Sequence, residues 1–382
     1  MPSSANPLNA PPGPNSRTRE TPAQAIREID DLFARAGLVR NLRKNSAGIA
    51  KRVRMERVAR EELRQAAPQT RIAPNGVVWL PVPGWEKTRW LWHGFSTRKG
   101  GESRAYCADD APGELNLGFT DADDREAVIR NRRLFAQAVT GDPATPLLTL
   151  RQIHSNVLVV SGREAASREL PLKVGVPSDR SSSLGPKGDG LMTDEPGLLL
   201  GIQTADCIPV LVADRKRCAV AAFHAGWLGT VQRIVESGIG RMRLEFGSRP
   251  EDLIAAIGPG IGPCCYAVGE EVLSSFESQF AYARELFREV SDTDPVRTKY
   301  PMLFLTQRAP GHSPIGPSLH LNLVEANRRQ LLAAGLKARS IKVVGGCTSC
   351  QPVLFFSHRA QRGHAGRMMS VIGIAETAPK MA

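Results

Sequence analysis

Long apolar runs are missing from this chain of 382 residues. No stretch approaches the roughly eighteen consecutive apolar residues of a membrane-spanning helix, and the first twenty residues lack the apolar segment of a secretory signal. We therefore expect a soluble protein of the cytoplasm. Its hydrophobic fraction of 42% and charged fraction of 23% are typical of a globular fold.

Cysteine is scarce, with seven residues spread unevenly along the chain. This spacing does not suit a disulfide framework and predicts reduced thiols or metal ligands. Cys347 and Cys350 have CxxC spacing, but one such pair without a second does not define a metal site, so we expect a structural role. Cys264 and Cys265, which follow two Gly-Pro turns, are predicted to be core thiols.

Positive charge is in excess, with a formal net charge of +12. Residues 1–70 hold thirteen Lys and Arg against seven Asp and Glu, which is half of the surplus. A positive field attracts nucleic acids, membranes and phosphorylated molecules. No aromatic residue is interleaved with the charges of residues 47–66 to stack on bases. A solvated helical extension is therefore favoured over a nucleic-acid contact.

The composition changes at about residue 76. Residues 1–22 are rich in Pro, Ser and Asn and predict a disordered arm. Apolar spacing predicts helices over residues 21–36 and 47–66. We therefore expect a basic, partly disordered and partly helical extension over residues 1–75 and a catalytic domain over residues 76–382.

Short apolar runs separated by Gly, Pro and Asp follow residue 76 and predict a sheet-rich α/β or α+β domain. Strands are expected at residues 77–81, 147–150, 157–160, 198–202, 208–213, 218–223, 253–257 and 341–344. Helices are expected at residues 124–139, 230–246 and 323–334. A long polar loop is expected at residues 161–187.

One hairpin brings two reactive side chains together. Residues 204–227 contain two six-residue apolar runs on either side of four polar residues. If the turn closes symmetrically, Ala213 pairs with Cys218, and Cys207 lies directly opposite His224. Directly opposed Cβ atoms are roughly 4.5–5.5 Å apart, which allows a thiolate and an imidazole to share a metal ion.

A third ligand is expected from His154, which lies at a junction between two predicted strands. Two histidines and one cysteine leave the fourth position of a tetrahedral zinc site open, as in catalytic sites. Copper(I) also accepts this ligand set. Asp206, beside Cys207, is expected to orient a ligand or receive a proton, or else to serve a turn.

Several motifs in the same order resemble the laccase-domain family, whose members are also described as multicopper polyphenol oxidoreductases, peptidoglycan editing factors and purine nucleoside phosphorylases. The resemblance covers about residues 90–375. Its motifs are HGFSTRKGG (93–101), LNLG (115–118), QIHS (152–155), DGLMTD (189–194), TADCIPVL (204–211), FHAGWLGT (223–230), IGPGIGPCCYAVG (257–269), LHLN (319–322) and FFSHRAQRGHAGRMMSVI (355–372).

This resemblance implies a layered α-β-β-α sandwich with mixed sheets and a metal site at His154, Cys207 and His224. Candidate substrate-binding residues lie within the same motifs: Arg98, Asn116, Arg359 and Arg367. The guanidinium groups of the three arginines suit phosphate. The chain departs from the family pattern at Leu228, where arginine is common, and at Ala267, where glutamate is common.

The resemblance also implies zinc-dependent phosphorolysis of adenosine, inosine and methylthioadenosine, with adenosine deamination as a second activity. A purine nucleoside and phosphate are then the expected partners, and Cys207 is expected to bind metal rather than attack substrate.

Three further functions stay open. Hydrolytic editing of peptidoglycan precursors could use the same metal site. A copper-dependent phenol oxidase would need several copper ions, for which seven histidines scattered singly are too few. A non-enzymatic module would bind nucleic acid through the basic N-terminus.

Overall fold

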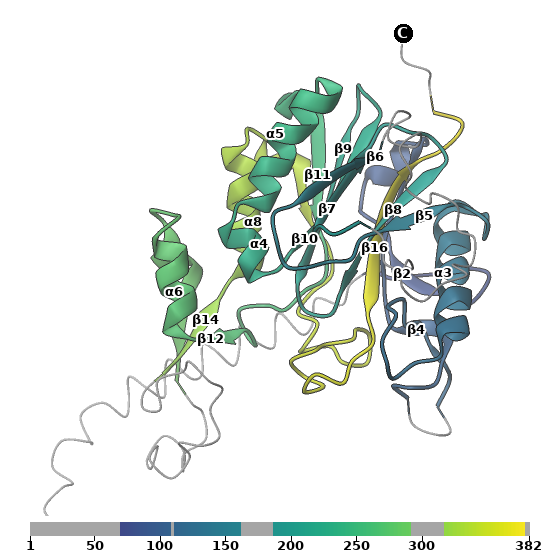
Figure 1. The fold of residues 1–382 in the computed structure, drawn as a ribbon, viewed down its shortest axis with the longest axis horizontal. Coiled ribbons are helices and arrows are strands. Elements are labelled where there is room, and N and C mark those ends of the chain that lie inside the picture. The colour runs from purple at the N-terminus through teal and green to yellow at the C-terminus, as the bar shows by residue number, and fades with distance from the viewer. Residues whose placement is uncertain (1–68, 108–110, 162–185, 292–316, 379–382) are drawn as a thin grey trace, which may run out of the picture.

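A computed structural model describes residues 69–107, 111–161, 186–291 and 317–378. The expected N-terminal arm, the two N-terminal helices and most of the polar loop at 161–187 lie outside the described residues. Within them, two six-stranded sheets are stacked between layers of helices (Figure 1).

The first sheet is built around a long C-terminal strand. β16 (Met368–Ile374) pairs in antiparallel fashion with both β3 (Leu91–Ser96) and β8 (Leu198–Thr204). The sheet is completed by β1 (Arg71–Ile72), β2 (Val78–Leu80) and β5 (Leu147–Thr149), in the order β1-β2-β3-β16-β8-β5. Because β5 runs parallel to β8, the sheet is mixed.

The second sheet has the order β15-β11-β9-β10-β7-β6 and is also mixed. Its strands are β6 (Leu158–Ser161), β7 (Gly190–Thr193), β9 (Ile208–Asp214), β10 (Ala219–Ala225), β11 (Leu253–Ile257) and β15 (Ile341–Val343). A small third sheet joins β12 (Ala267–Val268), β14 (Ser318–Leu321) and β13 (Phe287–Val290). β4 (Lys99–Ser103) follows β3.

Helices cover the outer face of each large sheet. α3 (Arg125–Thr140) packs on the first sheet, and α4 (Trp227–Val231), α5 (Ile234–Phe246) and α8 (Leu323–Ala333) pack on the second. The remaining helical segments are α6 (Glu270–Glu277), η1 (Trp85–Lys87), η2 (Pro250–Asp252), η3 (Ala283–Leu286) and η5 (Ala338–Ser340). No helix in the described ranges has the length and apolar character needed to cross a membrane.

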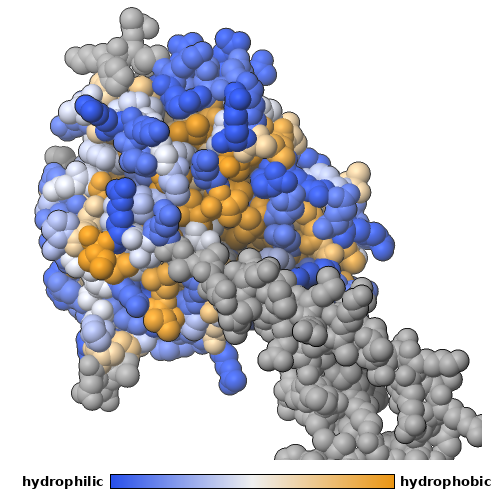
Figure 2. Space-filling view, turned by 180° about the vertical axis from the view of Figure 1, so that it is seen from behind, coloured by the Kyte–Doolittle hydropathy of each residue, from blue (hydrophilic) through white to orange (hydrophobic). Residues whose placement is uncertain are grey.

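The core explains why the central strands of the second sheet, β9, β10 and β11, are almost entirely apolar. Val210 and Val212 of β9 face the helices, whereas Leu211 and Ala213 face the first sheet. A strand covered on both faces reads as a continuous apolar run rather than an alternating one. The α-β-β-α sandwich predicted from the family resemblance is confirmed. Figure 2 shows the face opposite to that of Figure 1, where polar side chains surround a central apolar patch.

All eight expected strands are present, with ends shifted by a residue or two. β3, β7 and β16 were not expected, although all three overlap motifs of the resemblance. The helix expected at 230–246 is present over 234–246 as α5, but it does not continue to residue 230, because the chain breaks between α4 and α5 at Arg233, whose φ is 59°. The guanidinium group of Arg233 donates hydrogen bonds to the Glu236 carboxylate and to the backbone carbonyl of Gln279.

The expected hairpin register is also wrong, by two residues. Ala213 pairs with Val220 rather than Cys218, and His224 pairs with Pro209 rather than Cys207. Asp214 Oδ1 accepts hydrogen bonds from the backbone N–H groups of Lys216 and Arg217, which moves the turn one residue along the chain. A shift of two keeps every side chain on its expected face of the sheet.

His93 is a buried histidine whose imidazole is neutral. Its Nδ1 accepts a hydrogen bond from the backbone N–H of Val82 at 3.2 Å, and its ring packs edge-on against Trp85. Burial lowers the pKa of His93 to about 4, because charge is disfavoured away from water.

We predict that His93 contributes stability above about pH 6.5 and that this contribution falls as pH drops toward 4. The unfolded chain binds a proton there that the folded chain does not, which costs roughly 3 kcal/mol. Asn in place of His93 keeps an acceptor and does not titrate. Urea unfolding at pH 7 and pH 5 should therefore show a smaller loss of stability in His93→Asn than in the unaltered chain. An equal loss in both would contradict the prediction.

Candidate metal centre

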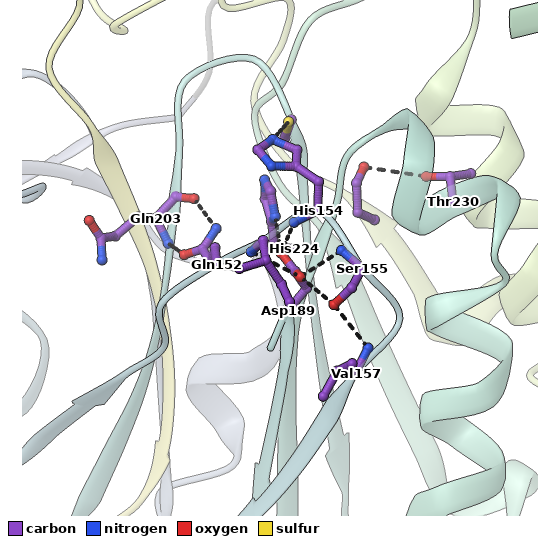
Figure 3. A network of polar contacts seen from close by, with 11 residues as sticks. Gln152, His154, Ser155, Val157, Asp189, Gln203, His224 and Thr230 are labelled. Carbon is purple, nitrogen blue, oxygen red and sulfur yellow. Dashed lines mark hydrogen bonds and ion pairs between the residues drawn. The ribbon is translucent and has the colours of Figure 1, made fainter. Parts of the chain in front are cut away.

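Three side chains from three segments converge between the sheets. His224 lies on β10 and is buried, Cys207 lies in the turn between β8 and β9, and His154 lies exposed in the loop between β5 and β6. One ligand atom from each lies within 4.8 Å of the others. Cys207 Sγ is 3.9 Å from His154 Nε2, and the two imidazole rings are 4.9 Å apart at their centroids (Figure 3). The structure thus brings together the trio expected from the sequence.

A glycine makes room for the thiol. The β9–β10 ladder ends at Ile208 and Ala225, so the same register continued by one pair places Cys207 beside Gly226. A Cβ atom at Gly226 would lie 2.9 Å from Cys207 Sγ and 3.4 Å from His154 Cδ2. Any side chain at this position would push the thiol out of the space it shares with the imidazoles.

The buried carboxylate of Asp189 holds two of the three side chains in place. Oδ1 accepts from the backbone N–H of His154 at 3.0 Å and from Nδ1 of His224 at 2.8 Å. Oδ2 accepts from the backbone N–H and hydroxyl of Ser155, each at 2.7 Å, and from the N–H of Ile153 at 3.2 Å. One carboxylate therefore fixes the histidine loop against β10 (Figure 3).

Gln152 ties the same loop to the other sheet. Its side-chain amide donates to the carbonyl of Gln203 and accepts from the N–H of Gln203, both at 2.7 Å. Gln203 lies on β8 of the first sheet, whereas Asp189 precedes β7 of the second. The loop is thus fastened to both sheets, which allows His154 to keep a left-handed φ of 57°.

The trio is strongly coupled in charge. Burial opposes ionisation of Cys207, but the nearby His224 and the hydrogen bond from His154 outweigh it and lower the pKa of the thiol to about 6. Burial likewise disfavours charge on His224, but Cys207 and Asp189 raise its pKa to about 9. Hydrogen bonds from His224 and Ser155 overcome burial at Asp189 and lower its pKa to about 2. A thiolate beside an imidazolium is a site that a cation can enter by displacing a proton.

The donor set fits a metal ion. Since Nδ1 of His224 binds Asp189, its Nε2 is left to face Cys207, and the carboxylate–histidine pair is the usual support of a metal-bound imidazole. Two nitrogens and one thiolate suit Zn²⁺ or Cu(I). His154 is exposed, so a fourth ligand position would open toward solvent.

Asp206 is held in the turn before Cys207 by two hydrogen bonds. Its φ is 97°, and its two oxygens accept from the hydroxyl of Thr348 at 2.6 Å and the backbone N–H of Arg359 at 2.7 Å. Both partners are donors, which favours the turn role among those expected for this residue. The contact fixes the turn that carries Cys207.

The predicted substrate-binding residues occupy different settings. Arg359 is exposed beside Asp206, donates to the carbonyl of Ala267 at 3.0 Å and lies over the ring of Tyr266 at 5.7 Å. Arg98 is paired with Glu114 at 2.6 Å and stacked on Phe356.

Asn116 and Arg367 contact each other. Asn116 is fully buried and accepts from the backbone N–H of Arg367 at 2.8 Å. The guanidinium group of Arg367 donates to the carbonyls of Ala365 and Gly366. Their assignment to substrate stays a prediction. Leu228 is 36% exposed on α4, just after Gly226.

Asp189, Gly226 and Thr348 have roles that the sequence alone did not indicate. Asp189 opens the DGLMTD segment and Gly226 lies in FHAGW, so both belong to motifs of the resemblance without an expected function of their own. An acidic residue followed by glycine at the start of an apolar strand is the signal that could have identified Asp189. Thr348 depends on a contact 142 residues away in the chain and had no local signal.

Comparison with known proteins gives a consistent result. The family model described as "Multi-copper polyphenol oxidoreductase laccase" matches residues 92–375. "Purine nucleoside phosphorylase YlmD" of Geobacillus stearothermophilus is 34% identical over 284 residues, which cover 74% of this chain and 90% of that protein. "Adenosine deaminase RL5" from an unknown prokaryotic organism is 32% identical over 184 residues, covering 48% of this chain and 61% of that protein.

The fold comparison agrees. The crystal structure of YlmD from Geobacillus stearothermophilus superposes with a TM-score of 0.61 at 31% identity, covering 81% of this chain and 100% of that one.

We predict that Gly226→Ala folds but loses one equivalent of bound metal, because the new Cβ takes the space of Cys207 Sγ. Its φ of −66° is open to alanine, so no backbone strain is added. Gly240→Ala is the matched control, since nothing lies within 4 Å of its Cβ position on α5. The control should keep its metal and gain up to about 1 kcal/mol of stability. Elemental analysis that finds equal metal in both variants would overturn this explanation of Gly226.

We predict that Asp189→Asn lowers metal affinity at the trio by roughly 10–100-fold. The neutral amide orients His224 less well, and its N–H₂ group, a donor, faces backbone N–H groups that are donors too. Affinity is measured by competition with a chromophoric chelator, at a temperature where circular dichroism shows the variant folded. Asp194→Asn, an exposed carboxylate just after β7, is the control. Unchanged affinity in Asp189→Asn would show that the Asp189 carboxylate does not position the metal ligands.

Proposed function

The chain belongs to the multi-copper polyphenol oxidoreductase laccase family, and from this membership we propose that it is a zinc-dependent purine nucleoside phosphorylase. Adenosine, inosine and methylthioadenosine are its proposed substrates, and residues 76–382 its catalytic domain. The observation that carries the proposal is the His154, Cys207 and His224 cluster, with its three ligand atoms within 4.8 Å. Support also comes from the name of the Geobacillus stearothermophilus relative, a purine nucleoside phosphorylase.

Zn²⁺ bound by His154, Cys207 and His224 would hold an oxygen nucleophile at the open fourth position and lower its pKa. Cys207 acts as a thiolate ligand, since its pKa of about 6 already favours the charged form. Asp189 keeps the proton of His224 on Nδ1 and so directs Nε2 toward the thiol. Asp189 is a positioning residue, because it touches the histidines rather than the substrate.

Arg359 is the proposed phosphate-binding residue. Its side chain is exposed, and no ion pair joins it to a carboxylate among the described residues. One guanidinium nitrogen is bound to the carbonyl of Ala267, which fixes the fork and leaves its other donors available. Because its backbone binds Asp206, the residue next to Cys207, it lies at the edge of the trio. Arg98 is less suited, since Glu114 already neutralises its charge.

The proposed reaction needs a nucleophile, an anion site and a place for the leaving base. A phosphate oxygen forms a bond to C1′ of the ribose, the bond from C1′ to the purine nitrogen breaks, and its electron pair leaves with the base, which takes up a proton. Ribose 1-phosphate and free base result. Two exposed apolar side chains offer a surface for the flat base. Ile153 precedes His154, and Leu228 follows Gly226 by two residues.

Adenosine deamination is a second candidate activity, favoured by the relative named adenosine deaminase. Water would then replace phosphate as the nucleophile, attack C6 of the purine and release ammonia. The trio would serve both reactions, because each needs an oxygen nucleophile held at the metal. Phosphate and Arg359 are needed in the first reaction alone.

Phenol oxidation and peptidoglycan editing are less well supported. A multicopper oxidase needs several ions near one another, whereas one histidine-containing metal group lies within the described residues. A hydrolase acting on peptidoglycan precursors would use the metal site but not phosphate. A requirement for phosphate therefore distinguishes it from the phosphorylase.

We predict that the purified enzyme converts inosine to hypoxanthine only when phosphate is present, with an equal amount of ribose 1-phosphate. Arg359→Lys should raise the KM for phosphate by roughly tenfold or more without loss of metal, because lysine keeps the charge but lacks the two-pronged geometry. Arg249→Lys, at an exposed arginine paired with Glu251, is the control. Deamination of adenosine should change little in either variant.

Two results would contradict this function. Base release that does not depend on phosphate, with free ribose as product, would indicate a hydrolase. A complete set of nucleosides left unchanged by metal-loaded protein would exclude both nucleoside activities.

A further inference from the structure

Four cysteines that are far apart in the sequence meet behind the trio. Cys264 and Cys265 lie in the turn after β11, and Cys347 and Cys350 lie in the segment after β15. Their four Sγ atoms all lie within 4.8 Å of one another. Cys350 Sγ is 3.3 Å from that of Cys264 and 3.4 Å from that of Cys265. The CxxC pair expected to stand alone therefore has its second pair in the adjacent cysteines.

We propose that Cys264, Cys265, Cys347 and Cys350 form a second metal site, which binds one Zn²⁺ through four thiolates. Tetrahedral zinc with Zn–S bonds of about 2.3 Å places its sulfurs roughly 3.8 Å apart. The observed spacing, from 3.3 Å to less than 4.8 Å, brackets that value. A disulfide needs an S–S distance of about 2.05 Å, which is shorter than the distances from Cys350 Sγ to Cys264 Sγ and Cys265 Sγ. With no fourth position left open, the site is structural rather than catalytic.

The surroundings are those of a thiolate site. The backbone N–H of Gly262 donates to Cys347 Sγ at 3.2 Å. A Cβ at Gly262 would lie 3.2 Å from Cys264 Sγ and 3.1 Å from Cys347 Cβ, so the glycine lets the backbone approach the sulfurs. Cys264 and Cys347 are buried, whereas Cys265 and Cys350 are half-buried and leave a route for a metal ion.

Charge also favours a cation at this site. Four thiols this close cannot all ionise unaided, because each new thiolate faces the ones already formed. A bound Zn²⁺ compensates that charge, and the thiols release their protons as it binds.

The proposed site would fasten the turn that carries Cys207. The backbone N–H of Thr348, between Cys347 and Cys350, donates to the carbonyl of Gly260 at 3.0 Å. Its hydroxyl donates to Asp206 at 2.6 Å, and the carbonyl of Asp206 accepts from the N–H of Ile261 at 2.8 Å. Both cysteine segments thus contact the residue next to Cys207. A metal that joins them would hold that turn from behind.

Elemental analysis of the full-length protein tests this site independently of the nucleoside activity. We expect about two zinc ions per chain in the unaltered protein and about one in Cys350→Ser. Cys207→Ala should also retain about one, held by the four cysteines. Cys107→Ser, which removes a thiol outside both clusters, should retain about two. Equal zinc in the unaltered chain and Cys350→Ser would overturn the proposal, whatever the outcome of the nucleoside assays.

A second measurement detects the thiolate ligands by spectroscopy. Cobalt(II) added to metal-free Cys207→Ala, or to the unaltered protein, should give the strong sulfur-to-cobalt absorption of a tetrahedral four-thiolate site. Bound metal should also protect Cys265 and Cys350 from alkylation until a chelator is added. A Cys347–Cys350 disulfide in protein purified without oxidant, or an iron–sulfur chromophore, would contradict a zinc site.

Discussion

The hydrogen bonds of the Asp189 carboxylate are the constraint on which the site depends. A buried carboxylate is costly unless it is fully hydrogen-bonded, and here five donors from three loop residues and His224 surround it. The same bonds that stabilise its charge set the positions of His154 and His224. A residue that is needed for the fold of the loop is thereby also needed for the geometry of the metal ligands. The hydrogen bonds from His224 and Ser155 also keep the pKa of Asp189 low.

Two acidic residues hold different parts of the trio in place. Asp189 fixes the histidine side, and Asp206 fixes the turn before Cys207 through Thr348 and Arg359. His154 and Asp206 both have left-handed φ angles, which typically cost of order 1–3 kcal/mol each. Each is held by hydrogen bonds from a separate part of the chain. The four-cysteine cluster extends the second of these supports, since Thr348 lies between two of its thiols.

Much of this arrangement follows from the sequence, and the rest depends on contacts it does not display. The apolar runs of β8, β9, β10 and β11 predicted strands because strands buried on both faces show no polar alternation. β16 was missed because Ser370 and Gly373 interrupt its apolar pattern, and β7 because its apolar segment is only two residues long. The hairpin register could not be read from symmetry, since the side chain of Asp214 caps the turn. The two cysteine pairs meet because each follows one of the neighbouring strands β11 and β15. These strands are separated by more than eighty residues, so the sequence alone does not show that the pairs meet.

We propose that His154, Cys207 and His224 hold one metal ion whose fourth ligand position is open. Zinc-edge X-ray absorption of the Cys350→Ser protein tests it most directly, because the other cluster is then disabled. We expect one sulfur neighbour at about 2.3 Å and two imidazole nitrogens at about 2.0–2.1 Å, with a further light atom whose distance changes when phosphate is added. A spectrum with no sulfur neighbour, or with several, would contradict it.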